Sequence, residues 1–227
     1  GQKYIQFPNN KVAIGSKYPT FSFNYTKGIG NVFGSDVDFD KWRFTINDNK
    51  NFKLAGELKY KIGIGGFLNN KKTFIQDYQH FNGNRLVVFT GDYMNSFLAA
   101  PYYANSTTAS FYTTLHVAHH FNGLLTNKIP LFKRLNWNLV GGSNAFYVNK
   151  NNNYVEVFAG LENIFKVLRV DVVGSYLNGR NGQVALRIGL GHAMESADRR
   201  WSLTGTLQTG LRSGDRPTLW ALLRYRD

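Results

Sequence analysis

The chain has 227 residues, of which 43% are hydrophobic, 15% aromatic and only 18% charged. It contains no cysteine, which excludes disulfide scaffolds and thiolate metal sites, and no apolar run approaches the roughly 20 residues of a transmembrane helix. The net charge of +13 indicates a polyanionic partner if the protein is soluble. In a membrane β-barrel it indicates a basic lumen or basic rims that face anionic headgroups.

Apolar and polar residues alternate over unusually long stretches, beginning with the runs at 21–26 and 42–47. The clearest run extends from Phe52 to Gly66. One parity of that run carries the apolar residues Phe52, Leu54, Leu58, Tyr60, Ile62 and Ile64. The other carries the charged residues Lys53, Glu57, Lys59 and Lys61. Globular strands are usually about 5–6 residues long, whereas membrane-spanning strands need about 9–11, so this length favours a membrane strand.

Further strands are predicted at 109–122, 135–148, 154–162, 167–177, 183–192, 200–211 and 217–226. Asn-rich and Gly-containing turn signals separate them, as at 149–153 and at Asn178–Gly179. Counting back from a periplasmic C-terminus, we expect the loops near 149–153, 178–182 and 212–216 to lie at the outer end of the strands. The links near 123–134, 163–166 and 193–199 then lie at the inner end. Glycines inside the strands, namely Gly63, Gly65, Gly141 and Gly142, predict bends or bulges.

The fold predicted from these patterns is all-β: a transmembrane antiparallel β-barrel of about 10–12 strands with meander topology. A single outer-membrane β-barrel domain is expected to cover residues 1–227. Every lysine lies at or before Lys166, and the later basic residues are arginines. This change of composition indicates a possible sequence seam near 167–193.

Several segments, in order along the chain, carry a family resemblance. They are "YPTFSFNYTKGI", "GSDVDFDKWRF", "DYQHFNGN", "APYYANSTT", "HHFNGLLTNKIPLFKRLNW" and "GLENIFKVLRVDVV". Together they resemble the C-terminal β-barrel region of a poorly characterised family of Gram-negative outer-membrane proteins, over roughly residues 3–192. Members of that family usually carry an N-terminal carboxypeptidase-regulatory-like domain. The last segment is more weakly similar to BamA-like barrels. The resemblance implies a barrel in the outer membrane and brings no biochemical activity with it.

Two sets of site residues follow from the barrel hypothesis. A lumen-facing charged row is predicted from Lys53, Glu57, Lys59, Lys61, Arg169, Asp171 and Arg187. This row would either set the selectivity of a pore or form a salt-bridged interior that fills a small barrel, and we favour the second reading. An aromatic girdle at the membrane interfaces is predicted from Trp42, Phe44, Trp137, Tyr154, Trp201 and Tyr225.

Three further patterns favour structural roles. His116 and His120 share a strand face about 13 Å apart while His119 points to the other face, which is poor geometry for one metal ion. Asp36, Asp38 and Asp40 alternate as in a calcium loop but lack its glycine and later glutamate, so a solvated rim is favoured over weak calcium binding. The stretch from Gly123 to Trp137 fits equally an amphipathic link at the inner membrane interface and a plain turn.

The function predicted is that of an integral outer-membrane β-barrel, acting as a membrane anchor or platform or as a narrow pore. No catalytic residue, metal or cofactor is expected. The expected partners are lipopolysaccharide or phospholipid and, during insertion, the barrel assembly machinery. The alternative is a soluble basic β-sandwich that binds nucleic acid or a polyanionic glycan, with salt-sensitive affinity. A barrel-type lipid enzyme is a weaker third hypothesis, because no nucleophile and base can be identified.

Overall fold

The computed structural model describes residues 2–7, 10–16, 18–30, 35–84, 86–89, 91–101, 105–122, 128 and 130–190. The first strands are β1 (Gln2–Phe7), β2 (Asn10–Ser16), β3 (Thr20–Gly28), β4 (Asp38–Asn51), β5 (Glu57–Lys72) and β6 (Val88–Phe89). The later strands are β7 (Tyr112–His120), β8 (Asn138–Asn149), β9 (Asn152–Ile164), β10 (Leu168–Leu177) and β11 (Arg180–Leu190). The short helices of the described residues, η1 (Lys53–Ala55), η2 (Ile75–Asp77) and α1 (Pro130–Leu135), lie between strands.

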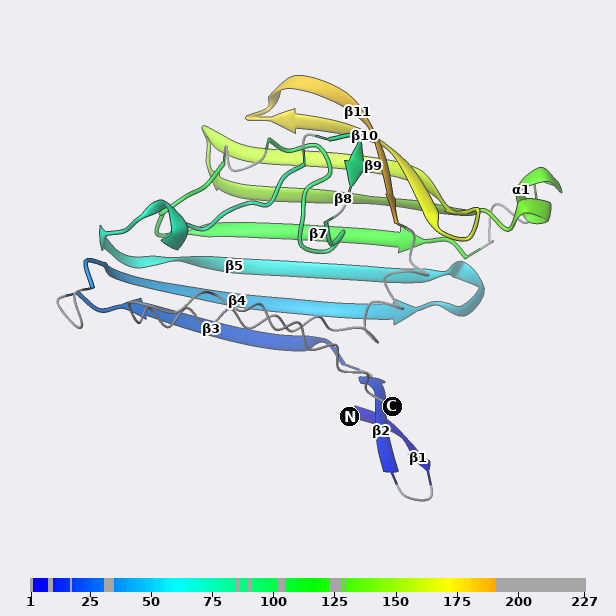
Figure 1. Cartoon of the computed structure of the whole chain (residues 1–227), viewed down its shortest axis with the longest axis horizontal. Coiled ribbons are helices and arrows are strands. Elements are labelled where there is room, and N and C mark those ends of the chain that lie inside the picture. The colour runs from blue at the N-terminus through cyan, green and yellow to red at the C-terminus, as the bar shows by residue number, and fades with distance from the viewer. Residues whose placement is uncertain are drawn as a thin grey trace, which may run out of the picture.

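One sheet of nine strands dominates the described part of the chain, in the order β3-β4-β5-β7-β8-β9-β10-β11-β6 (Figure 1). All neighbours are antiparallel except β6, which pairs in parallel with β11. β1 and β2 form a separate two-stranded sheet. The all-β prediction is therefore confirmed, and strands follow chain order apart from β6. The strands predicted at 200–211 and 217–226 lie outside the described residues.

The predicted strand from Phe52 to Gly66 is wrong at its start, because the chain reverses direction there. Lys53 adopts a positive φ of 57° and opens the one-turn helix η1, so that β5 begins only at Glu57. The amide N–H of Lys53 donates to the side-chain oxygen of Asn51 at 2.7 Å, and that of Phe52 donates to the carbonyl of Gly56 at 2.7 Å. The alternation of Phe52 and Leu54 with polar residues thus belongs to an exposed turn.

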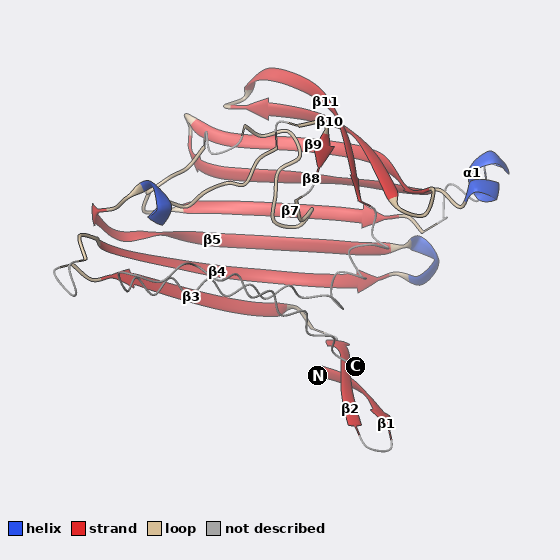
Figure 2. Ribbon diagram, in the orientation of Figure 1, coloured by secondary structure: helices blue, strands red, loops and turns tan. Residues whose placement is uncertain are grey.

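The described residues of 73–111, between β5 and β7, lie against one side of the large sheet and contact strands β7 to β10 (Figures 1 and 2). We call them the β5–β7 segment. We call that side the inner face and the opposite side the outer face. Two buried apolar clusters join the segment to the sheet. One contains Phe81, Phe97, Ala100, Tyr112, Phe146, Val148 and Tyr154, and the other contains Phe89, Leu98, Ala118, Val140, Phe158 and Val173. The core of the molecule therefore lies between the sheet and this segment.

Glycines in the strands permit close backbone approach. A Cβ on Gly142 would lie 2.1 Å from the carbonyl oxygen of Val117 in the neighbouring strand. Gly63 and Gly65 keep an unbroken register with Thr45 and Arg43 of β4, so the bulges predicted at these two positions are not found. The irregularities of this strand pair lie instead near Asp40.

The strand registers gather the connections at two ends of the sheet. Glu57 pairs with His120, His120 with Val140, and Asn138 with Glu162. The turn at η1, the link that contains α1 and the β9–β10 turn therefore share one end, the α1 end. The turns at 150–151 and 178–179 lie at the opposite end. For these described connections, the predicted division into two ends is confirmed.

Candidate functional site

The inner face is built around a fully buried glutamate in the middle of β9. Glu156 is 0% exposed, and its carboxylate accepts four hydrogen bonds. Two come from the sheet, where the Asn144 amide and the Tyr154 hydroxyl each donate at 2.7 Å. Two come from the β5–β7 segment, where the backbone N–H groups of Leu98 and Ala99 donate at 2.7 and 3.0 Å. The charge is thus stabilised by hydrogen bonds from both layers.

A second inner-face side chain holds the same stretch of backbone from β11. The Nε of Arg187 donates to the carbonyl of Leu98, and its Nη2 donates to the carbonyl of Asn84 at 3.3 Å. Because Glu156 accepts from the amide of Leu98, both backbone groups of this residue are bound by charged side chains of the sheet. Both contacts therefore reach main-chain atoms of Leu98.

A second polar cluster lies on β10 and its neighbours. The Nε of Arg169 donates to both carboxylate oxygens of Asp171, at 3.0 and 2.9 Å, with both residues buried. The guanidinium carbon of Arg169 lies 3.8 Å from the centre of the Tyr93 ring in the β5–β7 segment, within the range of a cation–π contact. His120 and Glu162 form a further buried pair at 2.8 Å.

Six members of the predicted charged row lie on strands of the large sheet. Lys59, Arg169, Asp171 and Arg187 are buried, and Lys61 is half-buried and donates to the Asn95 side chain of the β5–β7 segment. Glu57 begins β5 and accepts from Asn49. Lys53 is the exception, since it is exposed in η1 and its assignment to the row is wrong.

The acidic residues of β9 were missed by the sequence analysis. Glu156 and Glu162 share the inner face with Tyr154 and Phe158, while Val155 and Val157 make the other face apolar as well. Because apolar residues occupy both faces, the alternation of residue types does not show which face of β9 is the inner one. The carboxylate flanked by two valines in "YVEVF" could have identified Glu156 as a site residue, because a charged side chain within an apolar strand requires specific partners when it is buried.

The predicted aromatic girdle divides between the two faces. Trp42 and Phe44 lie on the outer side of β4 and pair in register with Tyr25 and Phe23 of β3. Tyr154 is wrong as a girdle residue, because it is buried on the inner face with its hydroxyl on Glu156. Trp137 is half-buried just before β8. Trp201 and Tyr225 lie outside the described residues.

The three histidines separate as their spacing predicts. His116 and His120 are buried on the inner face, where the first contacts Asn144 at 3.1 Å and the second pairs with Glu162. His119 contacts the carbonyl of Ala55 in η1 at 2.9 Å. Within the described part of the chain, no group of three or more acidic or histidine side chains is arranged to hold a metal ion.

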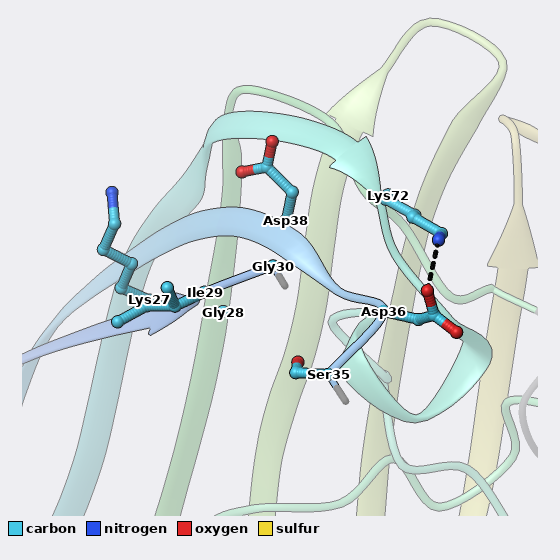
Figure 3. Close-up of a pocket in the computed structure, with 8 residues that line it drawn as sticks. All are labelled: Lys27, Gly28, Ile29, Gly30, Ser35, Asp36, Asp38 and Lys72. Atoms are coloured by element: carbon cyan, nitrogen blue, oxygen red, sulfur yellow. Dashed lines mark hydrogen bonds and ion pairs between the residues drawn. The ribbon is translucent and has the colours of Figure 1, made fainter. Parts of the chain in front are cut away.

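A cavity of about 400 Å³ opens where β3 leads into β4, lined by Lys27, Gly28, Ile29, Gly30, Ser35, Asp36, Asp38 and Lys72 (Figure 3). The three aspartates of the calcium-like pattern are each bound to protein groups. Asp36 pairs with Lys72 at 2.7 Å, Asp38 accepts from Asn69 at 2.7 Å, and Asp40 pairs with Lys27 at 3.1 Å. The hydrogen bond from Lys72 lowers the pKa of Asp36. These contacts favour the solvated rim over a calcium loop.

The link predicted as amphipathic contains the helix α1, of six residues, at the α1 end. Arg134 and Leu135 at the end of this helix are exposed, as is Lys128 before it. The remaining basic and apolar residues of 123–129 fall largely outside the described residues. Among the helices described, none has the length and apolar character needed to cross a membrane.

Comparison with protein families gives one match, over residues 1–161, to the model described as "Family of unknown function (DUF5686) C-terminal domain". The chain belongs to this family. A search of curated proteins gave no match, and a search of solved structures gave none. The match ends within β9, yet β10 and β11 continue the sheet of the DUF5686 C-terminal domain by regular antiparallel pairing. The resemblance to an uncharacterised family's C-terminal region, suggested by the sequence segments, is confirmed.

Proposed function

We propose that this domain is an integral outer-membrane β-barrel that acts as a membrane anchor or platform. The observation that carries the proposal is the outer face of the large sheet, where apolar side chains are exposed on β3 and on β7 to β11. The exposed apolar residues on this face include Phe21, Phe23, Tyr25, Val155, Val157, Val172, Tyr176, Val184 and Leu186. Soluble monomers rarely expose so large a continuous apolar surface, whereas a barrel turns such a surface toward lipid.

The distribution of charge supports the same proposal. On β9 and β10 the charged residues Glu156, Glu162, Arg169 and Asp171 all point to the inner face, while alternate positions carry valine or other apolar residues. A transmembrane strand needs this alternation of apolar and polar residues, because one face contacts lipid and the other faces the lumen. The six strands β4, β5 and β8–β11 are 10–16 residues long, which fits the about 9–11 residues required to cross.

The covered inner face favours the role of an anchor or platform and argues against an open pore. Side chains Phe97 and Leu98 of the β5–β7 segment are almost completely buried against the sheet. Packing of this kind fills the inner side of the sheet beside these residues, as in a barrel whose interior is occupied by side chains. We further propose that the sheet closes into a barrel in the complete fold, with lipopolysaccharide and phospholipid as partners and the assembly machinery as the insertion partner.

The test is to express the chain behind a bacterial signal peptide, separate the inner and outer membranes, and compare boiled with unboiled samples by gel electrophoresis. A closed membrane barrel is recovered in the outer membrane, resists carbonate extraction and migrates differently after boiling. Recovery as a soluble periplasmic monomer would overturn the proposal. It would favour the alternative, a basic β-sandwich that binds nucleic acid or a polyanionic glycan, which would then bind with a steep salt dependence.

A further inference from the structure

We infer that the inner face of β4 and β5 carries a binding site for a soluble phosphate-bearing anion, with Arg43 and Lys61 as the groups that bind it. The site lies beside the β5–β7 segment and requires no movement of that segment or of a strand. It depends only on the described sheet, so the inference goes beyond the proposed membrane role and is tested separately from it.

The hydrophobic core occupies a different part of the inner face. Both buried apolar clusters lie on strands β7 to β10, and among the described residues neither cluster includes a member of β3, β4 or β5. The inner positions of β3 carry short polar residues that are exposed, such as Ser22 and Asn24. A dissolved anion can therefore approach the inner side of β4 from the β3 edge.

Arg43 is the central cation of this part of the sheet. It pairs in register with Gly65, which pairs in turn with the buried inner-face residue Tyr112 of β7. Residues directly opposite each other on antiparallel strands share a face. The Nη2 and Nε atoms of Arg43 lie 3.5 and 3.6 Å from the position that a Cβ on Gly63 would occupy. The guanidinium therefore lies on the inner face over β5, where a glycine leaves room for it.

One nitrogen of Arg43 is buried without a hydrogen-bond acceptor. No group of the described residues accepts from its Nε, although a buried N–H that lacks a partner is costly. A guanidinium presents its N–H groups in a planar fork that matches the oxygens of a phosphate group. A phosphate bound at this fork would supply the acceptor that the protein does not.

Lys61 supplies the second positive charge of the site. It lies two residues along β5 from Gly63 on the same face, a step of about 7 Å. Its ammonium group has three donors, and the hydrogen bond to the Asn95 side chain uses one of them. The repulsion between Lys61 and Arg43 is stronger than the attraction between Lys61 and Asp92 of the β5–β7 segment. This excess of positive charge favours an anion as the ligand.

The other charged side chains on the inner positions of β4 and β5 are held by the protein. Lys41 donates to the carbonyl of Asp77 at 2.9 Å, and Glu57 at the start of β5 accepts from the Asn49 side chain. Lys59 is buried and also has a partner. The two cations described above are therefore the ones placed to receive a ligand.

The charge and the side of the sheet define the class of ligand. A phosphate monoester carries about −1.5 to −2 charges near neutral pH, which matches two cations better than a single carboxylate does. The site lies on the inner face, whereas the proposed lipid contact lies on the outer face. A phosphate of a lipid headgroup in the surrounding membrane does not reach it, so the ligand is water-soluble.

The test uses the full chain folded in detergent micelles. Binding of inorganic phosphate and of glycerol 3-phosphate is measured by isothermal titration calorimetry at constant ionic strength. The principal variant is Arg43→Gln, and its matched control is Lys50→Gln, which removes one charge from an exposed position on the other face of β4. Loss of one charge-assisted hydrogen bond weakens binding by about tenfold or more. We expect Arg43→Gln to raise the Kd by that factor and Lys50→Gln to match the wild type.

Two further variants separate weaker binding from a folding defect. Arg43→Lys keeps the charge but lacks the planar fork, so its Kd should lie between those of the wild type and Arg43→Gln. Lys61→Gln leaves the guanidinium in place and should also weaken phosphate binding. Circular dichroism and the urea midpoint establish which variants are folded. If both Arg43 variants fail to fold, Lys61→Gln against Lys50→Gln decides the test.

Each remaining outcome counts against a stated part of the inference. A wild-type protein with no saturable binding at millimolar concentrations of either phosphate compound would overturn the site. Equal weakening in Lys50→Gln and in the site variants would mean that total charge governs binding, and the site would again be wrong. Acetate that competes as well as phosphate would overturn the ligand class. Phosphatidic acid in the micelles that competes as well as glycerol 3-phosphate would overturn the soluble source.

The membrane proposal stands or falls on a different measurement. Outer-membrane recovery and heat-dependent gel mobility test the barrel and do not depend on phosphate. A protein that inserts normally but binds no phosphate refutes the site and leaves the barrel proposal intact. A protein that binds phosphate through Arg43 but is recovered as a soluble monomer refutes the barrel and leaves the site intact.

Discussion

At the scale of single residues, the buried ion pair on β10 is the most sensitive point of the inner face. Arg169 and Asp171 are almost fully buried, so Asp171→Asn leaves an uncompensated guanidinium in the interior. We expect the free energy of unfolding, measured by urea titration in detergent micelles, to fall by about 3–5 kcal/mol. Replacing both partners by Leu and Met should recover most of that loss, because two charges no longer need desolvation.

The exposed pair of Asp36 and Lys72 supplies the control for this prediction. Asp36 is solvent-exposed, so water and salt screen its attraction to Lys72. Asp36→Asn should leave the urea midpoint close to that of the wild type. If Asp36→Asn and Asp171→Asn destabilise the protein equally, the burial of the β10 pair does not govern its energetic role.

Two adjacent glycines in β8 give a second test at this scale. A Cβ on Gly142 would lie 2.1 Å from the Val117 carbonyl, whereas one on Gly141 would find its nearest atom at 3.6 Å. We expect Gly142→Ala to destabilise the sheet by about 1–3 kcal/mol through overpacking, and Gly141→Ala to be tolerated. Thermal melting followed by circular dichroism measures both variants, and equal melting temperatures would contradict the close approach of β7 and β8.

At the scale of the strand, the outer face of β9 separates the membrane hypothesis from the soluble one. Val157 is 60% exposed in the middle of this strand. If the outer face meets lipid, Val157→Lys costs about 2–4 kcal/mol at mid-membrane depth and lowers the yield of heat-modifiable protein. Leu54→Lys in the exposed turn η1 should leave the yield unchanged. Equal yields for the two variants would count against lipid contact at β9.

Strands and their faces could be predicted where one side of the alternation is clearly polar. β10 is the best example, since Arg169 and Asp171 alternate with Leu168, Val170 and Val172. Alternation does not distinguish the two faces of β9, because both are rich in apolar residues. For that reason Glu156 was not predicted as a site residue and Tyr154 was assigned to the wrong face. Alternation also failed at Lys53, because a positive φ depends on local hydrogen bonds that it does not report.

The β5–β7 segment could not be predicted as part of the core. Its buried residues Phe81, Phe89, Phe97 and Leu98 follow neither a strand nor a helix period. They are buried because a sheet face made by residues far away in the sequence lies against them. The candidate site shares this property, since the partners of Leu98 come from β9 and β11.

At the scale of the whole molecule, the α1 end combines basic and apolar side chains on exposed turns. Lys53 lies beside Leu54 in η1, and Lys166 lies beside Phe165 in the β9–β10 turn. If this end meets a phospholipid leaflet, each cation contributes about 1 kcal/mol to binding of an anionic surface. The double variant Lys53→Glu with Lys166→Glu should therefore weaken association with phosphatidylglycerol vesicles in a flotation assay.

The same exchange at the opposite end provides the comparison for this prediction. Lys71 and Lys150 are exposed there, and Lys71→Glu with Lys150→Glu makes an identical change in net charge. A loss of vesicle binding that is equal for the two double variants would show that total charge, and not the α1 end, governs the association. Raising the salt concentration should reduce the difference between them, because exposed charges are screened.

The position of Glu156 and Arg187 has a consequence for the order in which the chain folds. Strand pairs such as β8 with β9 join residues separated by short turns, so each hairpin closes at a small entropic cost. The bonds from Leu98 to Glu156 and to Arg187 span 58 and 89 residues of sequence. Contacts between residues so far apart in the sequence form slowly. They also require that β9 and β11 have already joined the sheet. We therefore expect the β5–β7 segment to dock last, onto a sheet in which β9 and β11 have already paired with β10.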